Sequence, residues 1–302
     1  LKSRKKLNNM TFNEKYSKIK YLASDELKKI EENITSSIHT REPLKSHIVQ
    51  FLTAPSKRIR PVLAILYTKA LGQNLNTQQL ELLTAIELVH NASLIHDDII
   101  DESNLRRGQK TISAEFGNKL GVISGDYILS IAMEKIANLN SIDILKKFSI
   151  TLNKMCQGEI NQNFDRFKIG TIEDYIEKSK NKTAYLFETA MTSCAMLSQA
   201  SGDISKINDF AMNVGIAFQI RDDLINFTKT DSSKPAENDL SEGIYTAPII
   251  YSQNTKNYTK GIEKTKSLLN NYIEKAAKQL ENLQDNEFTA ALKNFLELLK
   301  NE

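Results

Sequence analysis

Two short acidic segments carry the residues best suited to chemistry. In the first, residues 93–108, Asp97, Asp98 and Asp101 end an apolar stretch that is expected to be helical. Residues four apart share a helix face, so Asp97 and Asp101 can direct oxygens to one point, with Asp98 turned about 100° aside. Mg²⁺ prefers such oxygen ligands and is usually shared between carboxylates and substrate phosphates. The spacing therefore indicates a site for Mg²⁺ and a phosphate.

Acidic residues at helical spacing more often form a solvated face. Here, however, Leu94 and Ile95 precede the acids, and Ile99 and Ile100 are interleaved with them, so part of this helix is expected to be buried. Clustered carboxylates in buried surroundings need a cation.

A second acidic pair, Asp222 and Asp223, lies on another apolar stretch nearer the C-terminus. If the two helices are antiparallel neighbours, Asp97, Asp101 and Asp222 could face one another. They would then hold about two to three Mg²⁺ ions, and a diphosphate would fill the remaining coordination positions.

Apolar residues recur at intervals of three and four, which is typical of helices, as in the row Leu80, Leu83, Ile86, His90 and Leu94, of which His90 is the one polar member. The chain has only five prolines and eleven glycines, and most of them fall at apparent breaks between such rows. We therefore expect an all-α fold with one domain over residues 13–302. Residues 1–12 are expected to be disordered or foreign to the protein.

Composition narrows the class of protein. The net charge of +3 is small and the basic residues are spread out, so no nucleic-acid partner is expected. No apolar run approaches the roughly 18 to 20 residues of a membrane-spanning helix. Cys156 and Cys194 are not spaced as a metal site and are interpreted as core residues in a reducing compartment, which favours a cytoplasmic location.

Further motifs follow one another in a fixed order between residues 50 and 250. They are Lys57-Arg58-Ile59-Arg60-Pro61, the two acidic segments, Gly125-Asp126-Tyr127, Gly158-Glu159-Ile160, Lys182-Thr183 and Asn238-Asp239-Leu240. In this order the chain resembles the trans-prenyltransferases of the polyprenyl diphosphate synthase family. The resemblance implies a bundle of long helices around a central cavity, with both acidic motifs at its mouth.

The reaction implied by the resemblance is the Mg²⁺-dependent addition of isopentenyl diphosphate to an allylic diphosphate such as farnesyl diphosphate. It further implies a medium- or long-chain all-trans product, as made by the catalytic subunits of hexaprenyl, heptaprenyl and octaprenyl synthases and used for quinone side chains. The family's usual assembly is a homodimer. The two-component synthases add a small regulatory subunit as an alternative partner, and a short-chain farnesyl or geranylgeranyl synthase is an alternative activity.

The family's site residues can be carried over motif by motif. The resemblance assigns Asp97, Asp98, Asp101, Asp222 and Asp223 to the metal, Lys57, Arg60, His90 and Arg107 to isopentenyl diphosphate, Arg106, Lys182 and Lys234 to the allylic diphosphate, and Thr183 and Gln219 to the developing cation. Lys182, Thr183 and Gln219 are thus the expected catalytic residues. His96 is interpreted as a structural residue or as one that supports the site residues from behind.

Three positions depart from the family's pattern. Pro55 and Ser56 replace a glycine pair before Lys57, where Ser56 could instead cap a helix that begins at Lys57. Asn226 stands where a third aspartate is usual, and Ile244 where a lysine is common. We expect an active enzyme with a raised Mg²⁺ requirement.

Product length is expected to depend on the residues just before Asp97. Side chains four or five positions earlier in the helix lie about 6 to 7.5 Å deeper. These are Ser93 and Ala92, whose small size leaves a passage open, and Met133 is a candidate for its floor or for a core filler. Replacing Ala92 by Phe is expected to shorten the product.

Three other functions are alternatives. A metal-dependent phosphohydrolase built on His96 and Asp97 would need further histidine ligands, but His39 and His47 belong to no matching motif. A terpene cyclase or a head-to-head condensing enzyme would not need the set Lys57, Arg60 and Arg107. A non-catalytic regulatory subunit is expected to have lost more of its aspartates.

Overall fold

The computed structural model describes residues 11–198, 203–229, 243–252 and 258–300. Its elements are α2 (Phe12–Tyr21), α3 (Ser24–Ser36), α4 (Leu44–Thr53), α5 (Ile59–Ala70), α6 (Thr77–Ile100), β1 (Leu105–Arg106), β2 (Gln109–Lys110), α7 (Ile112–Phe116), α8 (Asn118–Asn138), α9 (Ile142–Phe164), α10 (Ile172–Ser179), the π-helical turn η1 (Lys180–Ala184), α11 (Tyr185–Met196), α12 (Ile204–Lys229), α14 (Ala247–Ser252), α15 (Thr259–Lys278) and α16 (Glu287–Lys300). The predicted all-α fold is confirmed.

Several helices begin where their sequence supplies a cap. Asn76 accepts a hydrogen bond from the backbone N–H of Gln79, whose side chain accepts one from the N–H of Asn76, and this pair starts the 24-residue helix α6. Thr11 and Glu14 form the same arrangement before α2. Helix α2 therefore begins within the last residues of the segment expected to be disordered.

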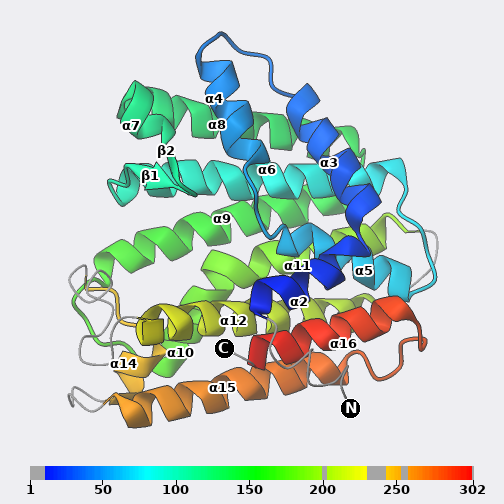
Figure 1. The fold of residues 1–302 in the computed structure, drawn as a ribbon, viewed down its shortest axis with the longest axis vertical. Helices are drawn as coiled ribbons and strands as arrows, with labels where there is room; N and C mark the ends of the chain where they lie inside the picture. The colour runs from blue at the N-terminus through cyan, green and yellow to red at the C-terminus, as the bar shows by residue number, and fades with distance from the viewer. Residues whose placement is uncertain (1–10, 199–202, 230–242, 253–257, 301–302) are drawn as a thin grey trace.

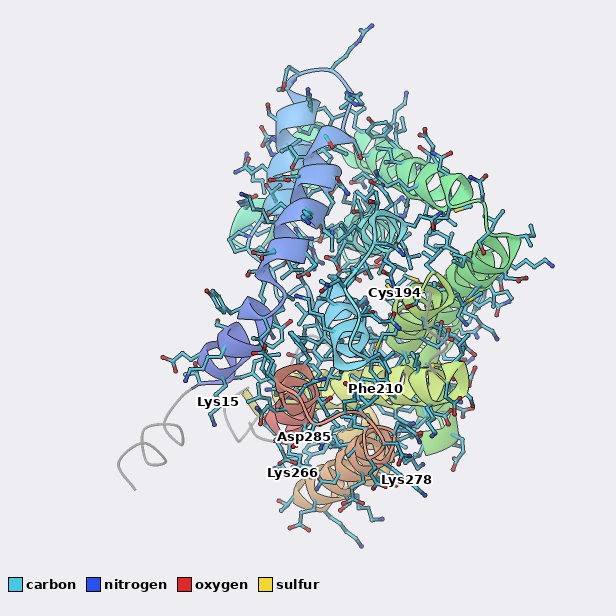
Figure 2. The ribbon with its side chains drawn as sticks, turned by 90° about the vertical axis from the view of Figure 1, so that its right-hand side faces the viewer. Lys15, Cys194, Phe210, Lys266, Lys278 and Asp285 are labelled. Carbon is cyan, nitrogen blue, oxygen red and sulfur yellow. The ribbon has the colours of Figure 1, made fainter. Side chains whose placement is uncertain are left out.

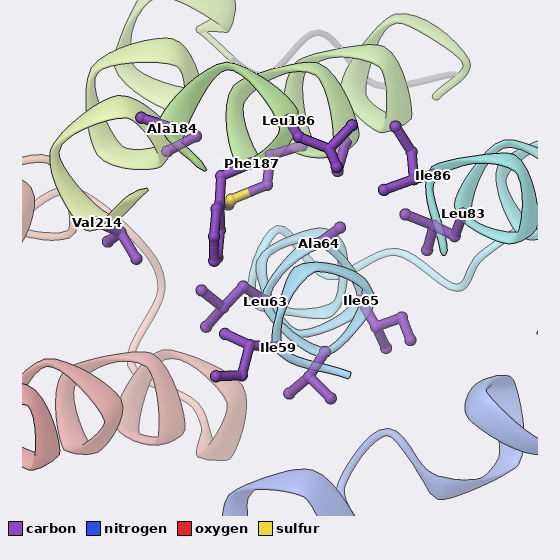
Figure 3. Close-up of a cluster of buried hydrophobic side chains, with 14 of the residues drawn as sticks. Ile59, Leu63, Ala64, Ile65, Leu83, Ile86, Ala184, Leu186, Phe187 and Val214 are labelled. Atoms are coloured by element: carbon purple, nitrogen blue, oxygen red, sulfur yellow. The ribbon is translucent and has the colours of Figure 1, made fainter. Parts of the chain in front are cut away.

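Helix α5 lies in the middle of the bundle. Its apolar residues face every direction, and Ile59, Leu63 and Ile65 are all buried. A helix that is apolar on all sides has to be surrounded by others. Figure 3 shows α5 with Leu63 toward Phe187 of α11 and Ala64 toward the same helix. Helix α5 therefore lies at the centre of the hydrophobic core.

The long helices α6 and α12 run toward the same end of the bundle, where the β1–β2 hairpin, α10 and α14 also lie (Figure 1). The antiparallel arrangement considered from the sequence is therefore wrong. The acidic segments nevertheless reach one end of the molecule, because each belongs to the C-terminal part of its helix.

The cysteines have different surroundings. Cys194 of α11 lies in the interior beside α12, which carries Phe210 (Figure 2), whereas Cys156 of α9 is exposed. The prediction that both are core residues is wrong for Cys156, because it lies on the solvent side of a half-buried helix. None of the described helices combines the length and the apolar character that a membrane crossing requires.

Helix α12 touches η1 at a glycine. A Cβ atom built on Gly215 would lie 2.5 Å from the Cα and 2.7 Å from the Cβ of Ala184. Both obstacles belong to or adjoin the backbone, so they cannot move aside as a flexible side chain would. Gly215 therefore lets α12 approach the turn that carries Thr183.

Replacing Gly215 by Ala is expected to lower the free energy of unfolding by about 1–3 kcal/mol, since the added methyl overpacks a rigid contact. Urea denaturation would measure the change. The matched control is Gly121→Ala, whose new Cβ would meet the end of the Ile99 side chain, with Cδ1 at 2.8 Å, which can rotate away. Equal effects of the two substitutions would contradict this explanation.

Candidate active site

A cavity of about 470 Å³ opens among α5, α6, α9, η1, α11 and α12 and the loop of residues 55–58. Most of the site residues expected from the sequence line it: Lys57, Arg60, His90, Ser93, Asp97, Arg107, Lys182, Thr183, Gln219 and Asp222. These residues are distant in the chain, so the fold gathers in one place what the motifs indicated separately.

Asp97 and Asp222 bring carboxylates into this cavity from two different helices. Neither has a hydrogen-bond or ion-pair partner among the described side chains. Burial raises the pKa of Asp97 to about 6, an effect that the charge of Lys182 opposes. Asp97 also lies in the last turn of α6, where the helix dipole disfavours a negative charge. Burial and the helix dipole thus outweigh the stabilisation that the ionised form of Asp97 receives from Lys182 and Arg106.

The donor set fits Mg²⁺ shared with a ligand. No group of three His, Cys, Asp or Glu side chains close enough to hold a metal occurs in the described part of the chain. Asp97 and Asp222 supply two hard oxygen donors facing one space, and Mg²⁺ commonly takes one or two carboxylates and completes its shell with water and phosphate oxygens.

Asp98 has a different environment from Asp97. It is 2% exposed, and its Oδ1 accepts a hydrogen bond from Nε of Arg106 at 2.5 Å, while its buried Oδ2 has no partner. Neither residue lines the cavity, and Asp101, which caps the end of α6, is exposed outside it. The structure therefore places the predicted metal ligands Asp98 and Asp101, and the predicted diphosphate ligand Arg106, around the cavity rather than in its wall.

Asp223 is bonded on both carboxylate oxygens. Tyr175 Oη donates to Oδ2 at 2.7 Å, and Gln219 Nε2 donates to Oδ1 at 2.8 Å. Thr183 in turn donates to Oε1 of Gln219 at 2.5 Å. Burial raises the pKa of Asp223 to about 6, and the hydrogen bonds from Tyr175 and Gln219 oppose this. The predicted metal ligand Asp223 thus lies behind Gln219, whose side chain it holds, instead of facing the cavity.

Arg60 and Arg107 bring cations into the same cavity. The guanidinium of Arg60 lies 4.9 Å from the centre of the Phe187 ring, and burial lowers its pKa to about 10. Burial, followed by the nearby Arg60 and Arg107, also lowers the pKa of His90 well below its ordinary value. His90 is therefore neutral at pH 7 and can serve as a hydrogen-bonding group rather than a charge.

Sequence reasoning missed an ion pair in the cavity wall. Arg58 and Glu87 line the cavity, and Arg58 Nη1 lies 2.8 Å from Oε2 of Glu87, which is 2% exposed. Arg58 also departs from helical geometry, with a φ of 53°. A glutamate four residues before Asn91 on an apolar helix carries no distinctive sequence signal, because its partner lies on another element.

The apolar part of the wall was missed as well. Phe187 and Phe218 line the cavity with ring centres 5.9 Å apart, and Leu94 and Met155 line it too. Aromatic faces attract cations, and apolar walls accept hydrocarbon. In the sequence these residues are indistinguishable from ordinary core positions.

Other predicted positions lie elsewhere. Ala92 is 3% exposed and is not part of the cavity wall, and Met133 packs against the core. Lys234 and the Asn238-Asp239-Leu240 motif lie outside the described residues. The suggested cap by Ser56 is wrong, because α5 begins at Ile59 and Ser56 Oγ is buried without a partner.

Replacing Glu87 by Gln is expected to lower the free energy of unfolding by about 3–5 kcal/mol, since it leaves the Arg58 guanidinium uncompensated in a buried cluster of cations. Thermal and urea denaturation would measure this loss. Glu81→Gln, on the same helix, is the matched control. Its ion pair with Lys135 at 2.7 Å is partly exposed, so its loss should change stability by about 1 kcal/mol or less. Similar losses in both variants would contradict a buried role for Glu87.

The family model described as polyprenyl synthetase matches residues 41–287. A prenyl transferase of Cyanophora paradoxa is 32% identical over 302 residues, covering 89% of this chain and 93% of its own. Heptaprenyl diphosphate synthase component 2 of Geobacillus stearothermophilus is 30% identical, covering 90% and 94%.

The fold is also similar to solved structures. A heptaprenyl diphosphate synthase from Staphylococcus aureus superposes with a TM-score of 0.83 at 25% identity, covering 92% of this chain and 98% of its own. A decaprenyl diphosphate synthase from Rhodobacter capsulatus has a TM-score of 0.85 at 21% identity, covering 94% and 98%, which bears on the fold alone. The cavity lined by Asp97 and Asp222 agrees with these matches, and the chain belongs to the polyprenyl synthetase family.

Proposed function

We propose that this prenyltransferase joins isopentenyl diphosphate to an allylic diphosphate, such as farnesyl diphosphate, and releases a medium- or long-chain all-trans polyprenyl diphosphate. One observation carries the proposal. A single cavity holds two unpaired carboxylates, Asp97 and Asp222, together with the separate cations Lys57, Arg60 and Arg107. Such a cavity suits two diphosphates, one bound with metal and one bound directly by cations.

Asp97 and Asp222 are the residues that would hold Mg²⁺, with about two to three ions in the complete site. When bound, Mg²⁺ neutralises charge that develops on the departing diphosphate. Lys182 lines the cavity 3.8 Å from Glu159 and adds a side-chain cation to the same task. Lys234, on the sequence's evidence alone, is a further cation for it.

Thr183 and Gln219 are oriented to stabilise an allylic carbocation. Because Thr183 donates its proton to Gln219, the remaining lone pairs of its oxygen are available to the cavity. Asp223 and Tyr175 fix Gln219 in turn, so we assign Asp223 this positioning role in place of metal binding. The rings of Phe187 and Phe218 add a cation-stabilising wall that excludes water.

The bond changes follow from this arrangement. The allylic C–O bond breaks, and its electron pair leaves with the diphosphate held near Asp97 and Asp222. The double bond of isopentenyl diphosphate, held by Lys57, Arg60, neutral His90 and Arg107, attacks the cation. This forms the new C–C bond and leaves a tertiary cation, whose loss of a proton to the released diphosphate forms the new double bond. No protein nucleophile is needed, and preorganised charges and dipoles supply the rate enhancement.

The product class and the assembly have different support. Relatives named heptaprenyl, solanesyl and decaprenyl diphosphate synthase favour a medium- or long-chain product. The relative named component 2 of a heptaprenyl synthase favours assembly with a small partner subunit, and a homodimer is the other assembly that we propose. Incubating the purified chain alone with both substrates, and sizing it by light scattering, would separate these assemblies.

The test of function is product formation from isopentenyl and farnesyl diphosphates with Mg²⁺, followed by chromatography of the dephosphorylated product. Asp97→Asn and Asp222→Asn are each expected to reduce turnover by at least about 100-fold, as for the loss of a main electrostatic contact to a transition state. Circular dichroism should show the helical fold unchanged.

Asp209→Asn is the matched control, since Asp209 is exposed on the same helix as Asp222 and lies outside the cavity wall. Its turnover should equal that of the unmodified chain. Diphosphate release without any condensed product would instead support a phosphohydrolase and overturn the proposal.

Ser93, rather than the buried Ala92, faces the cavity, so it is the wall position at which product length should respond. Ser93→Phe is expected to shorten the main product, because the ring obstructs the growing chain. Mass spectrometry of the products would measure this, with Ser93→Ala as the control that retains the length. A shortened product from Ala92→Phe alone would show that Ala92, not Ser93, forms the wall.

A further inference from the structure

Helix α2 lies against the outside of the loop of residues 55–58, whose inner side forms part of the cavity wall. Phe12, Tyr16 and Lys20 are spaced by four residues, so they form one stripe along this helix. Each of the three contacts the loop. Figure 1 shows α2 near the start of α5 and next to α16.

Two side chains of the stripe hold backbone carbonyls of the loop. Tyr16 Oη donates to the Lys57 carbonyl at 2.9 Å, and Lys20 Nζ donates to the Ser56 carbonyl at 2.7 Å. In a trans peptide the N–H points opposite to the C=O. These bonds therefore turn the N–H groups of Lys57 and Arg58 away from α2, which is the direction an anion in the cavity requires.

The third member of the stripe touches two cations. The Phe12 ring lies 4.9 Å from Lys57 Nζ and 4.1 Å from the guanidinium carbon of Arg221. Arg221 precedes Asp222 on α12. The ring attracts both cations and stacks on Tyr16 with centres 5.9 Å apart. Phe12 thus connects the loop to the second acidic segment.

Helix α2, which carries the stripe, is itself held by contacts with α5 and α16. Lys69 of α5 donates to the Leu22 carbonyl just after α2 at 3.1 Å and pairs with Glu26 at 2.9 Å. Tyr16 is 3% exposed and packs edge-on against Phe295 of α16, with ring centres 6.0 Å apart. Helix α2 can therefore act as a rigid brace rather than a loose cover.

The loop benefits from such a brace because its backbone takes a conformation that its own residues do not favour. Pro55 cannot adopt a positive φ. The left-handed conformation falls instead on Arg58, with φ of 53°, and costs free energy in a residue that is not glycine. External hydrogen bonds from Tyr16 and Lys20 stabilise this conformation.

We propose that Phe12, Tyr16 and Lys20 are positioning residues that set Lys57 and the adjacent backbone for the diphosphate of isopentenyl diphosphate. The identity of the ligand rests on the proposed function. The role of the stripe rests on the contacts with residues 55–58. Because Phe12 also touches Arg221 beside Asp222, the selective effect is expected of Tyr16 and Lys20, whose loss should weaken binding of this substrate and leave the allylic diphosphate unaffected.

The test is a calorimetric titration of isopentenyl diphosphate in EDTA, which isolates the metal-independent site and requires no turnover. Tyr16→Phe removes only the hydroxyl, and Lys20→Met only the charge and its hydrogen bonds. The double variant should bind about tenfold more weakly, as expected from two lost hydrogen bonds. Lys18→Met, an exposed position on the same helix, should bind as the unmodified chain does.

A further comparison separates positioning from general stability. Ile19→Val destabilises α2 through the core and leaves the stripe intact. It should lower the Tm without weakening isopentenyl diphosphate binding. In the steady state, the double variant should raise the KM for isopentenyl diphosphate about tenfold and change that for farnesyl diphosphate less than twofold.

Unchanged affinity in the double variant, or an equal loss in Ile19→Val, would overturn the positioning role. If the unmodified chain still made condensed product in that case, the proposed function would be retained and only the positioning role of the stripe would be rejected. Absence of isopentenyl diphosphate binding to the unmodified chain would overturn both.

Discussion

Two carboxylates that have no hydrogen-bond or ion-pair partner among the described side chains, on two helices that line one cavity, are the constraint on which the rest of the structure depends. Asp97 is half-buried in the last turn of α6, where both burial and the helix dipole oppose its ionisation. Asp222 faces the same space from α12. A cation that binds together with a diphosphate would remove the free-energy cost of ionising Asp97. The two carboxylates therefore favour a site that is completed when its substrate binds.

Lys57, Arg60 and Arg107 line the cavity from other elements than the two carboxylates, which belong to α6 and α12. Arg58 is already neutralised by Glu87, and His90 is kept neutral by burial and its cationic neighbours. The other cations that line the cavity are Lys57, Arg60, Arg107 and Lys182. This arrangement allows two anions to occupy one cavity in different places, which an elongation reaction requires and a hydrolase does not.

Much of the site could be predicted from the sequence, because short motifs keep their residue types together, but helical spacing alone did not show that Asp101 lies outside the cavity wall. What could not be predicted depends on tertiary distances. Adjacent aspartates differ in role: Asp98 pairs with Arg106, and Asp223 holds Gln219. Nothing in an acidic dipeptide reveals which member turns inward, because the neighbours that decide it come from other elements.

The relative direction of the helices and the shape of the loop backbone could not be predicted either, because they too depend on tertiary contacts. The spacing of apolar residues predicts that α6 and α12 are helices, but it does not predict that they run in the same direction (Figure 1). The left-handed Arg58 and the brace on its loop had no local signal, since the usual marker of such a conformation, glycine, is absent there. The cytoplasmic location and the disordered N-terminal segment stay predictions.

The most direct test of the central claim is a calorimetric titration of inorganic diphosphate into the protein at increasing Mg²⁺, compared with Asp97→Asn and Asp222→Asn. The account predicts that Mg²⁺ strengthens diphosphate binding to the unmodified chain by at least about tenfold, because metal and diphosphate complete each other's coordination. Each substitution should remove most of that gain. Diphosphate binding that is independent of Mg²⁺, or unaffected by both substitutions, would contradict it.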